Sequence, residues 1–397
     1  MHDRNHLANV GMTHEVNVIT NGLLDIPMLQ MLAEDGTPHK EATLPELDEK
    51  TAKDILHAMQ YVRVLDERMI GAQRQGRISF YLACTGEEAA TTASAAALKP
   101  QDMIMSQYRE QGALAYRGYT TEQFMNQMFS NEKDPNKGRQ MPIHYGDKAL
   151  NFMTISSPLG TQIPQASGYA YGQKMEGTDA VTICYFGEGA ASEGDFHAGL
   201  NMAAVLNCPV IFFCRNNGYA ISTPASEQFA GDGIASRGIG YGVKTIRVDG
   251  NDVMAVYAAT QTAREIAVKE QCPVLIEAMT YRLAAHSTSD DPTGYRSREE
   301  EEKWRAKDPI ARMKAWMTAQ GWFDEEANAK VVEKMREDVL NELKRVEKVD
   351  VPVIDEIIED VYDTPPWHLK AQLKELKEHI SKYPEHYPKT SGRLNRG

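Results

Sequence analysis

An acidic glycine turn and a pair of asparagines stand out among the residues that could carry chemistry. Glu188, flanked by glycines, follows the apolar run 181–186, and Asn217 closes an Asn-Asn pair shortly after the apolar run 210–214. A strand, a turn, a helix and a second strand form a βαβ unit, so both side chains should meet at the carboxyl ends of adjacent parallel strands. A carboxylate and an amide oxygen suit Mg²⁺, and glycines let the backbone approach a diphosphate closely. The spacing therefore predicts a magnesium–diphosphate site.

The same glycines allow a second interpretation. Gly187, Gly189 and Gly194 could instead cradle S-adenosylmethionine or a nucleotide, as in a Rossmann-like methyltransferase. That interpretation gives the asparagine pair no role, and Asn-Gly after a strand is also an ordinary turn signal. Titration with S-adenosylmethionine and with a diphosphate-bearing cofactor would separate the two.

Basic residues cluster near the same predicted strand ends. Arg109 follows the run 102–105, Arg215 precedes the asparagine pair, and Arg282 and His286 follow the last predicted strand. Each arginine alone would more often be a surface residue. Together they could neutralise an anion of two or three charges, which agrees with a diphosphate.

Periodicity and capping signals place the elements that must position these residues. An extended arm is expected over 1–45, followed by a single domain over 46–397 with an α/β core at about 150–285. The core should be a doubly wound, mostly parallel sheet flanked by helices. A helical C-terminal part of two or three helices should cover about 298–382. Strands are expected at 181–186, 210–214, 244–248 and 274–279, and helices at 51–75, 85–98 and 252–269, with capping boxes beginning at Thr85, Thr120 and Ser297.

Small or special residues recur at every fourth position within 160–172. Gly160, Pro164, Gly168 and Gly172 would share one helix face and allow another helix to approach closely. We expect this face at a subunit interface; packing against the chain's own sheet is the alternative.

Composition excludes several classes of partner. The chain has 397 residues, a formal charge of −13 and a pI near 5.4, which disfavours nucleic acid and anionic membranes. No apolar run is long enough to span a membrane. The first residues resemble neither a secretory signal nor an arginine-rich mitochondrial presequence, and the five cysteines show no CxxC spacing. These features predict a reduced, cytoplasmic protein.

Several stretches together resemble one known family. From about residue 50 to 380 the chain is similar to the α subunits of thiamine-dependent 2-oxo acid dehydrogenases, in particular the branched-chain (2-oxoisovalerate) members. The general thiamine motif has Asp in its glycine turn, whereas Glu188 resembles the branched-chain subfamily. The stretches that carry the resemblance are 76–81, 106–110, 156–164, 187–217 and 286–291.

The resemblance implies roles for individual residues. For Mg²⁺ it implies Glu188, Asn217 and the carbonyl of Tyr219, and for K⁺ it implies Ser156, Pro158, Thr161 and Gln162. For thiamine diphosphate it implies Gln107, Tyr108, Arg109, Ser157, Leu159, Glu188, Gly189, Ala190, Arg215, Asn217 and His286. For the substrate it implies Phe80, Tyr108 and Ser157. His286 is the catalytic candidate, as an acid or proton shuttle with a pKa near 6.5; a purely diphosphate-binding role is equally open.

The resemblance also implies an activity and partners. The activity is oxidative decarboxylation of branched-chain 2-oxo acids, such as 3-methyl-2-oxobutanoate, with acyl transfer to a lipoyl group. Partners would be a β subunit, in an α₂β₂ heterotetramer, and the lipoyl-bearing dihydrolipoyl acyltransferase. A pyruvate or acetoin dehydrogenase α subunit is the alternative within the class, and a non-catalytic scaffold subunit is disfavoured because the metal and diphosphate residues are present. The loop 286–298 should be ordered by cofactor and by pairing of Asp290 or Asp291 with Arg296 or Arg298.

Overall fold

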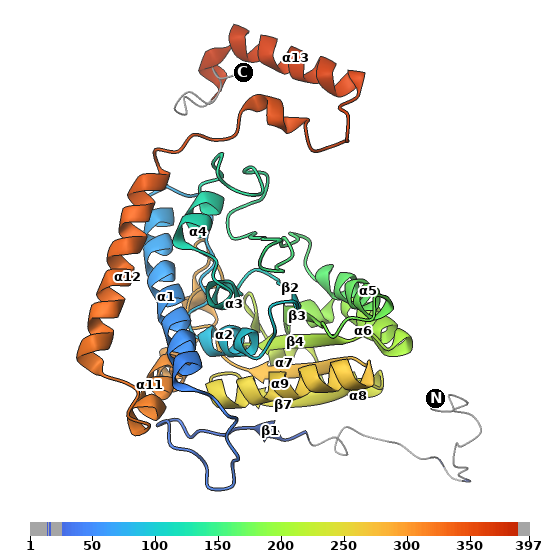
Figure 1. Cartoon of the computed structure of the whole chain (residues 1–397), viewed down its shortest axis with the longest axis vertical. Helices are drawn as coiled ribbons and strands as arrows, with labels where there is room; N and C mark the ends of the chain where they lie inside the picture. Colours follow the sequence, from blue (N-terminus) through green and yellow to red (C-terminus); the bar gives the residue numbers. More distant parts are fainter. Residues whose placement is uncertain (1–13, 15, 17–25, 388–397) are drawn as a thin grey trace.

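The centre of the molecule is a six-stranded parallel sheet. The computed structural model describes residues 14, 16 and 26–387, and its strand order is β1-β7-β8-β4-β3-β2 (Figure 1). The expected doubly wound α/β fold is confirmed. The strands are β1 (Met28–Leu29), β2 (Met103–Met105), β3 (Thr182–Gly187), β4 (Val210–Asn216), β7 (Lys244–Asp249) and β8 (Val274–Met279), and β5 (Tyr219–Ala220) pairs with β6 (Thr223–Pro224) in a separate hairpin.

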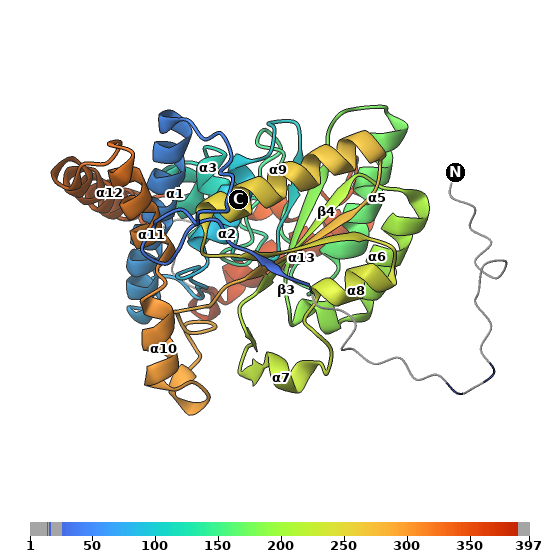
Figure 2. The same ribbon diagram turned by 90° about the horizontal axis from the view of Figure 1, so that it is seen from below.

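Helices cover both faces of this sheet, and further helices follow it (Figures 1 and 2). Those before β8 are α1 (Glu49–Arg74), α2 (Glu88–Ala96), α3 (Gln111–Tyr116), α4 (Thr121–Met128), α5 (Gln162–Met175), α6 (Gly194–Leu206), α7 (Ala225–Gln228), α8 (Ala235–Gly240) and α9 (Val253–Glu270). After β8 come α10 (Arg298–Arg305), α11 (Pro309–Ala319), α12 (Glu325–Val346) and α13 (Trp367–Lys382). Among the described residues, none of these helices is long and apolar enough to cross a membrane.

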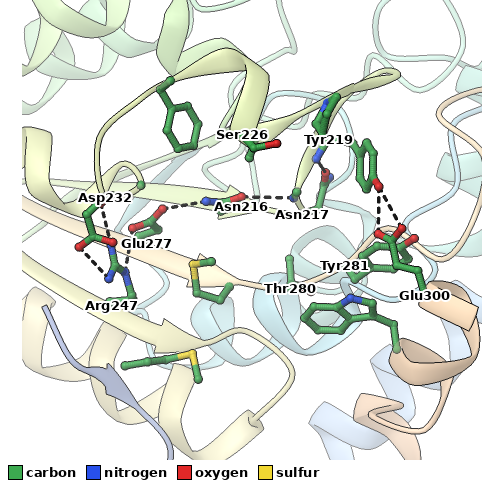
Figure 3. Close-up of a pocket in the computed structure, with 18 residues that line it drawn as sticks. Asn216, Asn217, Tyr219, Ser226, Asp232, Arg247, Glu277, Thr280, Tyr281 and Glu300 are labelled. Atoms are coloured by element: carbon green, nitrogen blue, oxygen red, sulfur yellow. Dashed lines mark hydrogen bonds and ion pairs between the residues drawn. The ribbon is translucent and has the colours of Figure 1, made fainter. Parts of the chain in front are cut away.

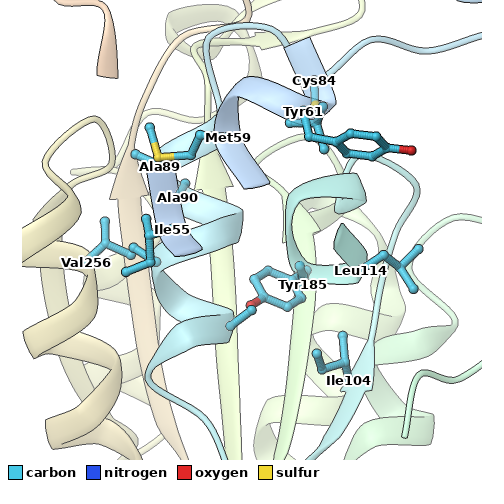
Figure 4. Close-up of a cluster of buried hydrophobic side chains, with 14 of the residues drawn as sticks. Ile55, Met59, Tyr61, Cys84, Ala89, Ala90, Ile104, Leu114, Tyr185 and Val256 are labelled. Carbon is cyan, nitrogen blue, oxygen red and sulfur yellow. The ribbon is translucent and has the colours of Figure 1, made fainter. Parts of the chain in front are cut away.

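Two hydrophobic clusters hold the layers together. Successive side chains of a strand point to opposite faces, so Ile183 and Tyr185 of β3 enter one cluster and Cys184 and Phe186 the other. The larger cluster packs the sheet against α1, α2 and α9; Figure 4 shows Ile55 and Tyr185 within it. The smaller cluster packs the sheet against α5 and α6. Burial on both faces explains why the central strands are continuous apolar runs.

The predicted elements are found within a few residues of their expected ends, with informative exceptions. Ser297 and Thr120 cap α10 and α4 as expected. Thr85 does not cap α2, because its hydroxyl donates instead to Asp66 at 3.0 Å and the helix begins at Glu88. The short strands β1 and β2 had no periodic signal, and four helices rather than two or three lie between 298 and 382. The division into an arm over 1–45 and one domain over 46–397 stays a prediction.

The predicted small-residue face is only partly found on α5: Gly160 precedes the helix, with φ +80°, and the remaining positions are partly turned away from the sheet. A Cβ atom built on Gly168 or Gly172 would meet no atom within 4 Å. Packing between α5 and α6 uses another glycine: a Cβ on Gly199 would lie 2.8 Å from Cγ2 of Ile163. Within this chain, therefore, Gly168 and Gly172 are not required for internal packing.

Candidate cofactor site

Four polar turns converge on one edge of the sheet. They follow β2, β3, β4 and β8, which lie side by side and run in the same direction, so their carboxyl ends share an edge. The turns carry residues 106–110, 187–190, 216–219 and 280–286. A cavity of about 400 Å³ opens there, which is where open α/β sheets bind their ligands.

The cavity brings together the residues that the sequence assigned to the cofactor. Its lining includes Phe80, Gln107, Tyr108, Arg109, Ser157, Leu159, Glu188, Gly189, Ala190, Arg215, Asn217, Tyr219 and His286. Residues of the lining that had no predicted role in the site are Leu82, Met141, His144, Glu193, Ala220 and Ile221; Gly187 of the predicted glycine turn and Arg282 of the predicted basic cluster also line it. Most of these additional residues are apolar or small, and no local spacing marks them.

Glu188, the predicted metal ligand, has one buried carboxylate oxygen that no described residue satisfies. Its Oε2 accepts a hydrogen bond from the Asn217 backbone N–H at 3.3 Å, whereas its buried Oε1 has no partner in the described structure. Burial raises the pKa of this carboxyl to about 7. A buried carboxylate oxygen without a donor is costly unless a cation satisfies it. The described residues contain no group of three or more His, Cys, Asp or Glu side chains placed for a metal. A site here would therefore combine one carboxylate with neutral oxygens, as Mg²⁺ accepts.

The two asparagines have separate tasks. Asn217 lines the cavity, and its amide nitrogen donates to Oε1 of Glu87 at 2.9 Å. Asn216 is absent from this lining and lies at a second cavity of about 530 Å³, which Asn217 also lines; there the Asn216 amide donates to Glu277 at 2.8 Å (Figure 3). Glu277 also accepts hydrogen bonds from Arg247 and from two backbone N–H groups. Asn216 is thus part of the fold, and only Asn217 faces the predicted metal site.

Arg215 is held between two buried acids that sequence reasoning missed. Its guanidinium donates through Nε to Glu110 at 2.6 Å and through Nη1 to Glu87. Both carboxylates are fully buried. Burial opposes ionisation of Glu87, but Arg215 and Arg109 outweigh it, and the pKa of Glu87 is lowered. Glu87 and Glu110 lie far from Arg215 in the chain, so no local spacing could pair them.

Glu110 also shapes the turn that presents three cavity residues. Its Oε2 accepts the backbone N–H groups of Gln107 and Tyr108 at 3.0 and 2.9 Å. The side chain of Gln107 in turn accepts the N–H of Gly187 at 2.7 Å. One carboxylate therefore ties the turn after β2 to the arginine at the end of β4, and Gln107 ties it to the glycine turn after β3.

His286 lies between two arginines and is neutral in the described structure. Arg109 and Arg282 approach its Nδ1 at 3.3 and 3.5 Å. Guanidinium groups can only donate, so Nδ1 accepts and the ring proton is on Nε2. Burial, followed by repulsion from both arginines, lowers the pKa of His286 to about 4. The ordinary pKa near 6.5 on which the sequence argument relied does not hold in this environment.

The predicted potassium loop contains converging oxygens outside the cavity. The hydroxyl of Thr161 lies 3.1 Å from the Ser156 hydroxyl and 2.9 Å from the carbonyl of Pro158. The amide nitrogen of Gln162 donates to the Tyr185 carbonyl at 3.1 Å, which anchors the start of α5 to β3. Hydroxyl, carbonyl and amide oxygens are the donor types that a hard cation takes.

The loop after His286 is closed by contacts other than those expected. Asp290 accepts from the backbone N–H of His286 at 2.7 Å and from the Tyr295 hydroxyl at 2.6 Å. Asp291 accepts from Thr293, and Arg296 donates to carbonyls of residues 282 and 284. The expected pairing of these aspartates with Arg296 or Arg298 is therefore wrong, because backbone carbonyls and a tyrosine lie closer.

Comparison with known proteins agrees with this geometry. The family model described as "Dehydrogenase E1 component" matches residues 56–354. The chain is 49% identical to 2-oxoisovalerate dehydrogenase subunit alpha 1, mitochondrial, of Arabidopsis thaliana over 383 residues, or 96% of this chain and 81% of the relative. It is 53% identical to the alpha subunit of Caenorhabditis elegans over 346 residues, or 87% and 80%. It is 50% identical to that of Homo sapiens over 369 residues, or 93% and 83%.

These relatives decide two points that the sequence left open or misjudged. All are named as 2-oxoisovalerate dehydrogenases, which favours the branched-chain interpretation over pyruvate or acetoin dehydrogenase. All are also named as mitochondrial, so the predicted cytoplasmic location is wrong. That prediction relied on the composition of the first residues and on the spacing of the cysteines. The chain belongs to the dehydrogenase E1 component family, whose members depend on thiamine diphosphate.

Proposed function

We propose that this chain is the α subunit of a branched-chain 2-oxo acid dehydrogenase, with 2-oxoisovalerate (3-methyl-2-oxobutanoate) as substrate. The reaction is oxidative decarboxylation with acyl transfer to the lipoyl group of a dihydrolipoyl acyltransferase. One observation carries the proposal: the unpartnered, buried Oε1 of Glu188 lies at a strand-end cavity together with Asn217 and cationic side chains. The similarity to 2-oxoisovalerate dehydrogenase α subunits supplies the substrate class.

Mg²⁺ would be held by the Glu188 carboxylate, the Asn217 amide oxygen and the Tyr219 carbonyl. Bound thiamine diphosphate supplies the nucleophilic carbon and the electron sink that decarboxylation requires. This chain would bind the diphosphate end through Tyr108, Arg109 and Arg215, with His286 donating a hydrogen bond from Nε2. Because its ring is neutral in the described structure, His286 offers a hydrogen bond rather than a positive charge.

The charges around the cavity explain why a metal would be required. Arg109, Arg215 and Arg282 face or line it, but Arg215 is already compensated by two buried acids. With Glu188 ionised, the three arginines are balanced formally by Glu87, Glu110 and Glu188, and Glu193 in the lining adds one further carboxylate. A diphosphate would therefore enter a site without net positive charge and beside a carboxylate. A divalent cation held by Glu188 would offset that repulsion.

Apolar side chains form the substrate side of the cavity. Phe80, Leu82 and Ile221 line it, and Tyr108 packs edge-on against His286 with ring centroids 6.4 Å apart. Such a wall favours a branched aliphatic side chain, although an apolar pocket discriminates by only about 1–3 kcal/mol per methylene. A β subunit, in an α₂β₂ assembly, would supply the rest of the site. K⁺ at the loop 156–162 would fix the segment that carries Ser157 and Leu159.

The metal assignment is tested by an isosteric substitution. We expect the full chain, assembled with its β subunit, to bind thiamine diphosphate only with Mg²⁺, and Glu188→Gln to lose this binding in calorimetry. Glu193→Gln is the matched control, since Glu193 also lines the cavity but has no predicted metal role. Undiminished, metal-independent binding by Glu188→Gln would refute the proposed site. Turnover of 3-methyl-2-oxobutanoate against pyruvate by the reconstituted complex tests the substrate.

A further inference from the structure

Glu87 contacts two residues of the proposed site from behind. It lies at the N-terminus of α2, is fully buried, and is not part of the cavity wall. One of its oxygens accepts from Nη1 of Arg215 and the other from the Asn217 amide at 2.9 Å. A single carboxylate thereby connects the proposed diphosphate-binding arginine with the proposed metal ligand.

The contact to Asn217 decides which end of that amide faces the metal. A carboxylate can only accept hydrogen bonds, so it selects the NH₂ end of the amide. The amide oxygen is then directed to the other side, where it accepts from the backbone N–H of Tyr219 at 3.2 Å. The carbonyl of Tyr219 is itself a proposed ligand. The Tyr219 N–H favours the same orientation, so without an acceptor at Glu87 only this 3.2 Å contact would oppose rotation of the amide to present NH₂, which cannot bind a cation.

The contact to Arg215 differs in purpose from that of Glu110. Glu110 takes Nε of Arg215 and also organises the turn after β2. Glu87 accepts a hydrogen bond from Nη1 of the same guanidinium and another from the amide of Asn217. Of the two acids, therefore, only Glu87 contacts both the arginine and the proposed metal ligand. Groups behind metal ligands are commonly worth about 10–100-fold in metal affinity.

We propose that Glu87 is a positioning residue that orients the Asn217 oxygen toward Mg²⁺ and keeps Arg215 beside it. This inference rests on the proposed function, because it requires that the cavity hold a metal and a diphosphate. Glu87 touches neither group and acts through its two partners.

The neighbouring acid supplies a matched control. Glu88 is on the same helix and equally buried, but it pairs with Arg63 of α1, away from the cavity. We would assemble the wild-type chain, Glu87→Gln and Glu88→Gln with the β subunit and titrate each with Mn²⁺ at saturating thiamine diphosphate. Free Mn²⁺ is read from its electron paramagnetic resonance signal. We expect Glu87→Gln to bind Mn²⁺ about 10–100-fold more weakly than wild type, and Glu88→Gln to match wild type.

The outcomes separate this inference from the function on which it rests. If wild type binds no Mn²⁺ with the cofactor, the proposed function fails. If wild type binds and Glu87→Gln binds equally well, only the role of Glu87 fails. In the double variant Glu87→Gln/Asn217→Asp, residue 87 becomes the hydrogen-bond donor and residue 217 the acceptor, and the total charge is unchanged. The double variant also provides a test if Glu87→Gln alone does not assemble. Recovery of assembly and Mn²⁺ binding in the double variant supports the inference; binding no tighter than in Glu87→Gln, or no assembly, overturns it.

Discussion

Asp66 should destabilise this protein at neutral pH although it has four hydrogen-bond donors around it. Its carboxylate, on α1, is buried and accepts from the Tyr81 hydroxyl at 2.7 Å, the Cys84 N–H at 2.8 Å and the Thr85 hydroxyl at 3.0 Å, with the Cys84 thiol at 3.5 Å. Burial nevertheless raises the pKa of Asp66 from 3.8 to about 6. The segment it holds also provides the Ala83 carbonyl that accepts from Arg109.

The sign of the effect follows from the two pKa values. Folding binds a proton to a group whose folded pKa is raised, so the ionised carboxylate costs free energy of folding at alkaline pH. The raised pKa of Asp66 lowers the free energy of unfolding by about 3 kcal/mol at pH 8, because a shift of one pKa unit corresponds to about 1.4 kcal/mol. The cost falls as the pH drops through 6 toward 3.8, and roughly half of it is gone at pH 5.

Asp66→Asn removes this charge while keeping most contacts. Its oxygen can still accept from Cys84 N–H and the Thr85 hydroxyl, and its NH₂ can donate to the Tyr81 hydroxyl, which loses its own acceptor at a cost of about 1 kcal/mol. We therefore expect the variant to be more stable than wild type by about 2 kcal/mol at pH 8 and nearly equal to it at pH 5.

Urea unfolding of the assembled, cofactor-free enzyme at both pH values measures the difference. Asp102→Asn is the control: Asp102 is buried but pairs with Arg264 at 2.6 Å, so its removal strands a guanidinium and should destabilise by about 3–5 kcal/mol at either pH. Loss of stability in Asp66→Asn that is the same at pH 5 and pH 8 would refute the reasoning, because the hydrogen bonds would then outweigh burial.

Three further predictions concern the site and the assembly. The ring of His286 should stay neutral down to about pH 5 in cofactor-free enzyme. Its pKa should rise when Mg²⁺ and thiamine diphosphate bind, because the anion offsets the two arginines. NMR of labelled histidine measures this pKa, and titration near pH 6.5 without cofactor would contradict the prediction. Gly168→Leu should lower the assembled mass in light scattering without unfolding the chain. Gly199→Val, by contrast, should destabilise the fold by about 1–3 kcal/mol, because it overpacks the contact between α5 and α6. An intact heterotetramer for Gly168→Leu would exclude a subunit contact at that position. Ser287→Glu should abolish lipoyl-dependent turnover and increase protease cleavage within 286–298, because a carboxylate next to His286 repels the diphosphate. Ser289→Glu is the control, since Ser289 is exposed. Equal behaviour of the two variants would place Ser287 away from the site.

Local sequence was sufficient for the four central strands, for most of the long helices and for the positions where chemistry could occur. The apolar runs 181–186 and 210–214 predict β3 and β4 because a strand buried on both faces must be continuously apolar. Their ends place Glu188 and Asn217 at one sheet edge, and the structure has these residues in contact at 3.3 Å. This much is determined by the chain because parallel βαβ units leave few alternatives.

Tertiary structure decided how the site is held and charged. Glu87 and Glu110 are brought to Arg215 only when α2 and the turn after β2 pack beside β4. Asn216 donates to Glu277, whereas its neighbour Asn217 donates to Glu87 and lines the cofactor cavity. The pKa of His286 follows in the same way from burial and from two arginines contributed by other turns. Pairing, burial and local dielectric depend on neighbours that are distant in the chain, so no local pattern can specify them.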